Sequence, residues 1–142
     1  MKKKIKFKGK DFFGGGVILY HGKKLLLQKV DDKPYWEDFG GKTDREDNTI
    51  IDTSFRECEE ESNKVLNREF LESQIKLNKE KCYYMLNNNK YFVYMIYVSR
   101  KCKNYLIPEL FGDIECHDKI KRKVEWVVKN EKLEIHPRII NL

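Results

Sequence analysis

The residues in this sequence that could do chemistry are acidic side chains that follow a pair of glycines. A Gly-Gly-Lys run at residues 40–42 precedes the run Arg-Glu-Cys-Glu-Glu-Glu at residues 56–61, which holds four carboxylates in five positions. On a helix, Glu57, Glu60 and Glu61 share one face, because side chains three and four positions apart are neighbours. Carboxylate oxygens suit a hard divalent cation such as Mg²⁺ or Mn²⁺, which also binds substrate phosphates. The pattern therefore predicts metal-dependent chemistry on a phosphate group.

A second interpretation of the acidic run is a solvated helix face without a function. Like charges at this spacing destabilise a helix by about 0.2–0.5 kcal/mol per pair. Their place in the later turns adds to this cost, because the helix dipole disfavours negative charge there. A bare glutamate-rich helix is usually such a face, but the glycine pair, Lys42 and Arg56 at this spacing favour the metal site.

The acidic run must lie on a helix for these carboxylates to meet. Thr49 is a suitable N-cap, and Asp52 three positions later completes a start that resembles a capping box. Small and apolar residues recur at helical spacing on the face opposite the glutamates, namely Ile51, Phe55, Cys58 and Ser62. We therefore expect an amphipathic helix that begins after Thr49 and turns its glutamates away from the core.

These residues resemble the signature of the Nudix hydrolases, Gly-x5-Glu-x7-Arg-Glu-U-x-Glu-Glu-x-Gly-U, in which U is a bulky aliphatic residue. Gly41 supplies the first glycine, and the core Arg-Glu-x-x-Glu-Glu begins at Arg56 and is intact. This core is the specific part of the signature. The resemblance covers about residues 14–138 and implies the Nudix fold, an α/β/α sandwich with a mixed β-sheet.

The loop before the helix departs from the signature. Fourteen residues separate Gly41 from Arg56, one more than the signature allows. The single glutamate of the signature falls on Asp47 when counted forward from the glycine, and on Asn48 when counted back. The helix start at Thr49 indicates that the extra residue lies in the loop.

The end of the signature also differs, because Asn63 replaces the terminal glycine and Val65 comes one place late. Asparagine tolerates the left-handed conformation that ends many helices, so Asn63 can take the role of the glycine. We expect both departures to be tolerated variations.

The resemblance implies hydrolysis of a nucleoside diphosphate linked to another moiety. Glu57, Glu60 and Glu61 would hold the Mg²⁺ or Mn²⁺ ions with the backbone carbonyl of Gly40. Arg56 would orient the glutamates through charge-assisted hydrogen bonds without touching the substrate.

In this family the general base is either a glutamate of the signature or a residue of a distant loop. The long polar segment before the last expected strand offers Glu109, Asp113, Glu115 and Asp118. We favour Glu115, which lies midway between the strands at residues 91–98 and 124–128; a solvated loop glutamate is the alternative.

Three residues near the signature are candidates for substrate binding. Lys42 could contact phosphate or pair with an acidic neighbour, and Trp36 and Phe39 could stack on a nucleobase or be buried. The candidate substrates are nucleoside triphosphates, dinucleotides or nucleotide sugars. Decapping of an mRNA 5′ end is an alternative, and a non-catalytic domain that senses a nucleotide or docks a partner is another.

Length and composition predict one globular domain over residues 1–142, with 40% hydrophobic and 13% aromatic residues. The net charge is +6 in spite of the acidic helix, and lysines gather at residues 1–8 and 119–123. Such basic segments favour polyanions and keep RNA open as a partner, although a lysine-rich chain can also reflect codon bias. The sequence also leaves a homodimer open as an alternative to a monomer.

Several classes of protein are disfavoured by what the sequence does not contain. It has no run of eighteen apolar residues and no apolar segment of a signal peptide after its basic start. Its four cysteines are widely spaced, which argues against zinc or a disulfide framework. A phosphate-binding P-loop would need a glycine where Trp36 stands. We expect a cytoplasmic protein without a membrane segment.

The remaining pattern predicts the elements around the acidic helix. Two β-hairpins are expected, at residues 17–29 and 81–98, with Asn-rich residues 87–90 as the turn of the second. A short helix or loop is expected at residues 67–75, a last strand at residues 124–128 and a short final helix at residues 136–140. Helices on both sides of these strands would form a mixed α/β sandwich.

Overall fold

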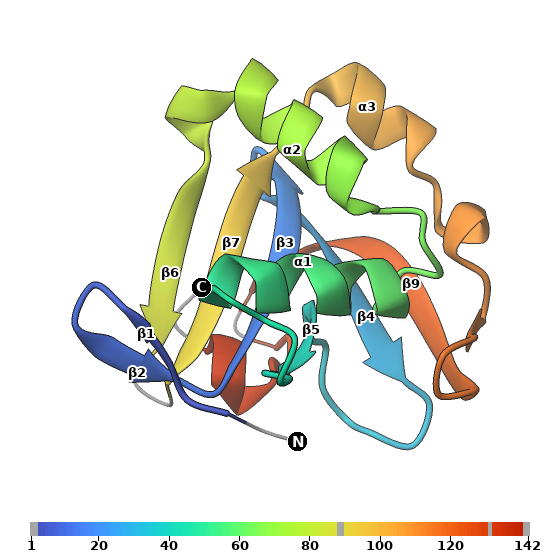
Figure 1. Cartoon of the computed structure of the whole chain (residues 1–142). Helices are drawn as coiled ribbons and strands as arrows, with labels where there is room; N and C mark the ends of the chain where they lie inside the picture. Colours follow the sequence, from blue (N-terminus) through green and yellow to red (C-terminus); the bar gives the residue numbers. More distant parts are fainter. Residues whose placement is uncertain (1–2, 88–89, 131, 141–142) are drawn as a thin grey trace.

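A computed structural model describes residues 3–87, 90–130 and 132–140 of the chain. It is a mixed α/β structure with three α-helices among the described residues (Figure 1). The elements follow in the order β1 (Ile5–Phe7), β2 (Lys10–Phe12), β3 (Gly14–His21), β4 (Lys24–Val30), β5 (Phe39–Lys42), α1 (Ile50–Glu61), α2 (Arg68–Leu77), the 3₁₀ helix η1 (Lys79–Lys81), β6 (Tyr83–Asn87), β7 (Tyr91–Tyr97), α3 (Arg100–Tyr105), the 3₁₀ helix η2 (Pro108–Phe111), β8 (Ile114–Glu115), β9 (Ile120–Val128) and the 3₁₀ helix η3 (Pro137–Ile139).

Strand β3 lies in the middle of a mixed sheet with the strand order β6-β7-β3-β4-β9-β8. It pairs in parallel with β7 and antiparallel with β4. The two predicted hairpins, β3–β4 and β6–β7, are both confirmed. Two residues of the predicted Asn-rich turn, 88 and 89, lie outside the described residues.

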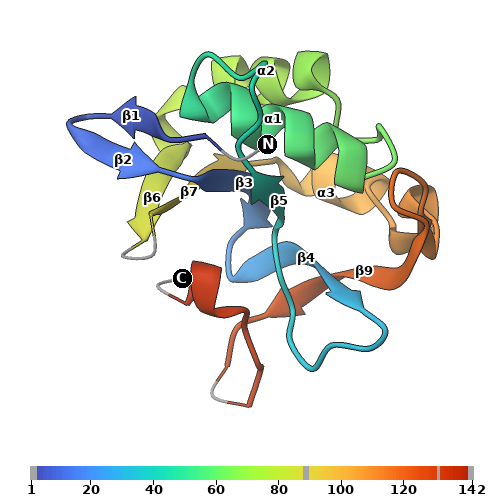
Figure 2. The ribbon, with the colours of Figure 1, turned by 60° about the horizontal axis from the view of Figure 1, so that its bottom comes forward.

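Two different strands share one edge of β3. Residues 14–17 of β3 pair with β5, whereas β4 pairs with β3 only at Tyr20 and His21. Figure 2 shows β4 and β5 leaving β3 in different directions.

The two faces of the sheet are covered unequally. On one face, α1 and α2 pack their apolar residues against Val17, Leu19 and Phe92. On the other face, Ile139 of η3 packs against Ile18 and Val93. Helices were expected on both sides, but α1 and α2 lie on the same side (Figure 2). The reason is the short connection at residues 62–67, which cannot carry the chain across the sheet, and a single 3₁₀ turn covers the second face in the described part of the chain.

Several helices and strands begin or end at other residues than predicted. The segment expected at residues 67–75 is the helix α2, which Asn67 caps by accepting a hydrogen bond from the Phe70 backbone N–H. The last strand begins at Ile120, four residues before the expected start, and the final helix is only a 3₁₀ turn. No helix of the described residues is long and apolar enough to cross a membrane.

The basic N-terminal segment was expected to offer positive surface charge, but part of it folds into the core. Strands β1 and β2 form a hairpin that buries Ile5 and Phe12. The Lys3 backbone N–H donates to Thr43 Oγ1 at 2.8 Å, and Lys3 Nζ donates to the Arg45 carbonyl. The segment is therefore tied to the loop that follows the glycine pair.

Both ends of the acidic helix are as the sequence predicts. Thr49 and Asp52 form a reciprocal capping box, with the Asp52 N–H 3.1 Å from Thr49 Oγ1 and the Thr49 N–H 3.0 Å from Asp52 Oδ2. At the other end Asn63 has φ +55°, which confirms that it takes the left-handed conformation expected of the missing glycine.

Helix α1 packs closely on β3 because Gly15 has no side chain. A Cβ at this position would lie 2.5 Å from Ser54 Oγ and 3.1 Å from the Phe92 carbonyl oxygen. We expect Gly15→Ala to lower the free energy of unfolding by about 1–3 kcal/mol, because the added methyl group must push α1 from the sheet. Urea denaturation measures this change.

The companion variant Gly15→Ala with Ser54→Ala removes the nearest contact, since Ser54 Oγ is the atom that the methyl group meets first. It should recover part of the loss, with Ser54→Ala alone as the control. Equal stability of Gly15→Ala and the wild type would show that the helix-to-sheet contact is not as tight as described.

Candidate functional site

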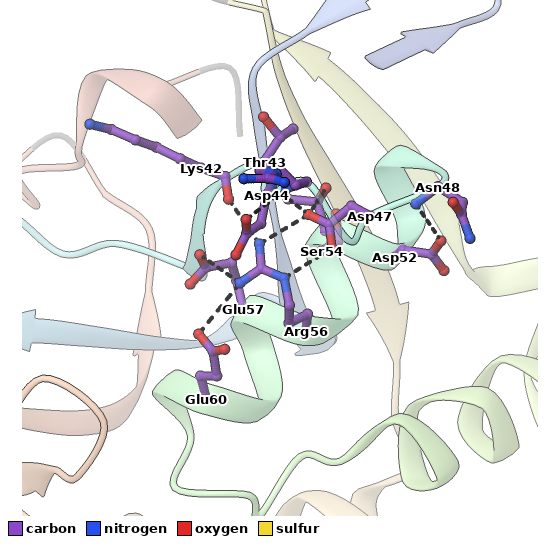
Figure 3. A network of polar contacts seen from close by, with 12 residues as sticks. Lys42, Thr43, Asp44, Asp47, Asn48, Asp52, Ser54, Arg56, Glu57 and Glu60 are labelled. Atoms are coloured by element: carbon purple, nitrogen blue, oxygen red, sulfur yellow. Dashed lines mark hydrogen bonds and ion pairs between the residues drawn. The ribbon is translucent and has the colours of Figure 1, made fainter. Parts of the chain in front are cut away.

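Arg56 is the centre of a network of charged groups between α1 and the preceding loop (Figure 3). Its Nε and Nη2 atoms donate to Asp47 Oδ1 and Oδ2 at 2.9 and 3.0 Å, and Nη2 also donates to the Lys42 carbonyl at 2.9 Å. Burial alone would raise the pKa of the Asp47 carboxyl, but hydrogen bonds from Arg56 and Thr53 outweigh it and hold that pKa below its usual range. The network fixes the guanidinium and the loop together.

The remaining side of the guanidinium faces two of the signature glutamates. Arg56 Nη1 lies 3.3 Å from Glu57 Oε2 and 3.5 Å from Glu60 Oε2. His117 Nε2 is 3.8 Å from the same Glu60 oxygen. Arg56 is thus placed where an orienting residue must be, in contact with both carboxylates.

The geometry also distinguishes the two candidates for the single carboxylate of the signature. Asp47 is 3% exposed and holds Arg56, whereas Asn48 is exposed and donates its backbone N–H to Asp52. Counting forward from Gly41 therefore finds the residue that contacts the site. Thr49 is the N-cap of α1 as predicted, so residues 42–48 form the loop between the glycine pair and the helix.

Glu61 turns in a different direction from Glu57 and Glu60. Its Oε1 accepts hydrogen bonds from the Gly40 backbone N–H at 2.8 Å and from Gln28 Nε2 at 2.9 Å. Burial raises the pKa of Glu61 well above its usual range and also raises the pKa of Glu57. Both carboxylates are therefore in surroundings that a positive charge would stabilise.

A half-buried arginine from the C-terminal turn, Arg138, approaches the glycine pair. Arg138 Nε donates to Asp38 Oδ1 at 2.8 Å, and its Nη2 donates to the Gly40 carbonyl at 3.3 Å. Asp38 is fully buried and also accepts a 2.6 Å hydrogen bond from the Tyr91 hydroxyl. The carbonyl that was predicted to bind a metal ion thus contacts a guanidinium.

One of the four cations in the basic segment at residues 119–123 is buried, whereas Lys119, Lys121 and Lys123 are exposed as predicted. Arg122 is 1% exposed, and its guanidinium donates to Gln28 Oε1 at 2.9 Å and to the Phe111 carbonyl at 2.8 Å. It also donates to the Glu61 backbone carbonyl. Arg122 therefore belongs to the interior of the site, because the end of α1 and the loop after η2 need a donor there.

The loop that carries Glu115 is attached to the end of α1 by Asn63. The Asn63 amide donates to the carbonyls of Phe111 and Ile114 at 2.7 and 2.8 Å, and its oxygen accepts from the Cys116 N–H at 2.8 Å. Asparagine at this position therefore does more than permit the helix to end. It fixes the loop at the edge of the site.

Glu115 itself is 4% exposed. Its two oxygens accept backbone hydrogen bonds from His117 at 3.1 Å and Asp118 at 2.7 Å. The carboxylate therefore stabilises its own turn as well as facing the site, and a solvated loop glutamate is excluded.

Two hollows adjoin the acidic helix and share Lys42, Glu57 and Asp118 in their walls. The larger hollow, of about 480 Å³, lies between β4, β5 and the loop of Glu115, and its charged and glycine walls are Asp32, Lys33, Glu37, Gly40, Gly41, Lys42, Glu57, Glu61, Glu115, Asp118, Arg122 and Arg138. The smaller, of about 330 Å³, adds Arg56, Glu60 and His117. Glu109 and Asp113 line a separate hollow, so the geometry leaves Glu115 and Asp118 as the loop residues nearest the candidate site.

The structure separates the three residues predicted to bind substrate. Lys42 is exposed and lines both hollows. Phe39 is fully buried and stacks on Phe111 at 5.9 Å between ring centroids, so the prediction that it stacks on a nucleobase is wrong. Trp36 is half-buried, lies under Lys123 Nζ and is not part of either hollow.

The predicted metal ligands are close in sequence but divided in space. Glu57 and Glu60 face Arg56, Glu61 faces Gly40 and Gln28, and the Gly40 carbonyl faces Arg138. Within the described ranges, no three His, Cys, Asp or Glu side chains gather in a group that could hold a metal ion as they stand. A cation at this site would have to draw the carboxylates from their present partners.

Gln28, Asp38, Arg122 and Arg138 are the site residues that sequence reasoning missed. A polar residue after the apolar run at residues 25–27 was a local signal for Gln28, and the place of Asp38 just before Phe39-Gly40 was another. The two arginines carry no such signal, because their partners are far away in the sequence.

No protein-family model matches the chain. The curated proteins contain no sequence that resembles it closely enough to count as a relative.

Asp47→Ala should lower the free energy of unfolding by about 1.5–3 kcal/mol, because it removes both hydrogen bonds between the Arg56 guanidinium and the Asp47 carboxylate. Asn48→Ala is the matched control, and at this exposed position it should change stability by less than about 0.5 kcal/mol. Urea denaturation measures both. A larger effect at Asn48 than at Asp47 would contradict the assignment of the carboxylate.

The ion pair of Asp47 and Arg56 also predicts how the free energy of unfolding depends on pH. The folded protein holds the pKa of Asp47 below its usual value of 3.8, so the Asp47 carboxylate stabilises the fold above that pH, and this contribution is lost as the pH falls through the lowered pKa. The difference in stability between wild type and Asp47→Ala should therefore shrink in acid.

Proposed function

We propose that the protein is a divalent-cation-dependent hydrolase that cleaves the pyrophosphate linkage of a nucleoside diphosphate derivative. We further propose that its α/β structure is a Nudix-type α/β/α sandwich in which the 3₁₀ turn η3 takes the place of the second helical layer. The observation that carries the proposal is the placement of Glu57 and Glu61 beside Gly40 and Gly41 in the wall of one polar hollow. The substrate would be a nucleoside triphosphate, a dinucleotide or a nucleotide sugar.

The close contact between the glycine pair and the acidic helix supports this proposal. A Cβ at Gly41 would lie 2.5 Å from the carboxyl carbon of Glu57, so any other residue there would displace the carboxylate. The glycine thus allows a backbone strand to lie directly against the carboxylate. Such an approach is what a site shared by carboxylates and a backbone carbonyl requires.

The donor set fits Mg²⁺ or Mn²⁺ by its chemistry. Glu57, Glu60, Glu61 and the Gly40 carbonyl are all oxygen donors, and the raised pKa of Glu57 and Glu61, caused by burial, would be relieved by a cation. These four residues would hold the metal. When bound, it would neutralise charge on the pyrophosphate and lower the pKa of the attacking water.

Other residues of the chain would orient the glutamates and bind the phosphates of the substrate. Arg56 would keep Glu57 and Glu60 in place through its contacts at 3.3 and 3.5 Å. Lys33, Lys42 and Arg138 bring positive charge to the same hollow, where the phosphates of a substrate would lie. Arg138 would exchange its hydrogen bond to Gly40 for one to a phosphate oxygen.

Glu115 would act as the general base on the attacking water, because it lines the hollow opposite the acidic helix. Asp118, which lines both hollows and is exposed, is the nearest alternative. A carboxylate in this role must reach the water directly or through one further water.

One observation favours a second candidate function, a nucleotide-sensing domain without catalysis. The Gly40 carbonyl is hydrogen-bonded to Arg138, and Glu61 is hydrogen-bonded to the protein's own groups. A domain of this kind would bind the phosphates of a nucleotide with its arginines and would not need the metal.

Glu60→Gln should lower the turnover of a nucleotide substrate in Mg²⁺ by roughly 10²–10³-fold, the scale on which loss of one electrostatic contact lowers kcat. Glu59→Gln is the matched control, because Glu59 neighbours it but accepts a hydrogen bond from the Arg68 N–H outside both hollows. Its turnover should stay near that of the wild type. Circular dichroism confirms that both variants fold.

Calorimetric titration with Mg²⁺ or Mn²⁺ separates the two candidate functions. The hydrolase should bind the metal more tightly with a nonhydrolysable nucleotide present. Nucleotide binding that is indifferent to the metal, without hydrolysis, would favour the sensing domain instead. Hydrolysis that survives excess EDTA would contradict the metal mechanism.

Glu115→Gln should lower turnover by about 10²–10⁴-fold, the usual effect of removing a general base, and should leave Mg²⁺ affinity nearly unchanged. The amide retains an oxygen for the backbone hydrogen bonds of His117 and Asp118, so the turn is kept. Glu109→Gln, in the separate hollow, is the control. Normal turnover of Glu115→Gln with a large loss in Asp118→Asn would move the base to Asp118.

A further inference from the structure

A basic pocket lies at the end of the sheet away from the acidic helix. It has a volume of about 420 Å³ and is lined by His21, Lys23 and Lys24 of the β3–β4 turn and by Arg100 and Lys103 of α3. Asn104 and Val128 complete its wall, which contains no aspartate or glutamate. Five basic side chains around one concave surface without a carboxylate form a site for a phosphate-bearing ligand.

The pocket and the candidate active site occupy opposite ends of the same strand. Lys24 at the start of β4 lines the basic pocket, whereas Gln28 and Val30 toward its end line the larger hollow. Four to six residues of extended chain span roughly 13–20 Å. The basic pocket is therefore a separate site, and it is not formed by either of the basic segments noted in the sequence.

Aromatic rings continue from this pocket across the end of the sheet. The ring of His21 lies 5.4 Å from that of Tyr97, Tyr97 lies 5.5 Å from Tyr20, and Tyr20 lies 6.0 Å from Tyr83. In the sheet register Tyr20 is opposite Tyr97. The rings therefore form a row from the β3–β4 turn to the start of β6.

The row is open to solvent and carries a cation of its own. Tyr83 is 48% exposed, and Tyr20 and Tyr97 are half-buried. Lys81 Nζ lies 4.4 Å from the centre of the Tyr97 ring. These tyrosines are on the face of the sheet opposite α1 and α2, whereas α3, which lines the pocket, packs on the same face as those helices. The ring of His21 at the end of β3 connects the two. In Figure 1 the ends of β7 and β3 and the helix α3 follow one another along this edge.

We propose that this edge binds single-stranded nucleic acid. Proteins that bind single strands combine cations that follow the backbone with exposed aromatic rings on which bases stack. The basic pocket would hold phosphates, and the half-exposed tyrosines beside it would contact bases. A lipid surface is disfavoured, because the groups next to the cations are aromatic rings with polar hydroxyls and not aliphatic side chains.

The test is fluorescence anisotropy of the full-length protein with a labelled RNA of about 12 uridines, in EDTA so that hydrolysis does not interfere. A labelled thymidine DNA of the same length shows whether the sugar matters. Saturable binding of either strand supports the proposal. No binding of either strand at low salt overturns it.

Three cations of the pocket are removed in Lys23→Gln with Arg100→Gln and Lys103→Gln. This variant should bind RNA at least about tenfold more weakly, and its slope of log affinity against log salt should fall by about 2. The matched control, Lys4→Gln with Lys6→Gln and Lys8→Gln, removes equal charge from the N-terminal hairpin and should bind within about twofold of the wild type. A larger loss of RNA affinity in the control variant than in the pocket variant would overturn the proposal.

A pair of neighbouring tyrosines tests the aromatic row. Tyr83→Leu should weaken RNA binding about five- to a hundredfold, the loss expected for one stacked base. Tyr84→Leu is the control, because Tyr84 is 37% exposed but packs on Phe7 and Phe92 on the other face of β6. Equal affinity of Tyr83→Leu and the wild type, or binding of inorganic polyphosphate or anionic vesicles as tight as that of RNA, would show an unspecific anion patch and overturn the proposal.

Discussion

The candidate site depends on two arginines from the last part of the chain, one that pairs with the buried carboxylate of Asp38 and one that donates to buried oxygens at the end of α1. Arg138 holds Asp38 and the Gly40 carbonyl, and Arg122 holds Gln28 and the end of α1. A buried carboxylate is costly unless it is paired. The packing of β5 on α1 is therefore stable only when β9 and the C-terminal turn are in place, so that the site forms with the whole fold.

The same arrangement connects structure to the proposed chemistry. Glycines at β3 and β5 bring the backbone against α1, which buries Glu57 and Glu61 and raises their pKa. Asn63 fixes the opposite wall by holding the loop of Glu115 with three hydrogen bonds. The hollow between these walls thus has fixed carboxylates and arginines of the chain on several sides, as a site for a charged phosphate group needs.

Local features of the fold were predictable because neighbouring residues determine them. The capping box of Thr49 and Asp52 and the left-handed Asn63 depend on contacts within a few positions. Apolar runs around short turns likewise predicted the β3–β4 and β6–β7 hairpins. In the site, the contact of Arg56 with Glu57 and Glu60 that the resemblance implied is present.

The parts of the fold and of the site that were not predictable depend on contacts between residues that are distant in the sequence. Arg122 and Arg138 look like surface charges until β9 and η3 bring them to Gln28 and Asp38. Phe39 resembles a candidate for base stacking until Phe111 covers it, and the spacing of Glu61 does not reveal its hydrogen bond to Gly40. The lysines of the N-terminal segment likewise predicted an exposed basic segment, whereas Ile5 and Phe12 are buried in the core.

The most direct measurement of the central claim is phosphorus NMR of the products formed from a nucleoside triphosphate, a dinucleotide and a nucleotide sugar in Mg²⁺ or Mn²⁺. We predict that at least one of them is cleaved at the bridge between the α-phosphorus and the next phosphorus atom, which yields a nucleoside monophosphate as one product. Absence of cleavage in all three with either metal, or cleavage at a phosphate ester or glycosidic bond instead, would contradict it.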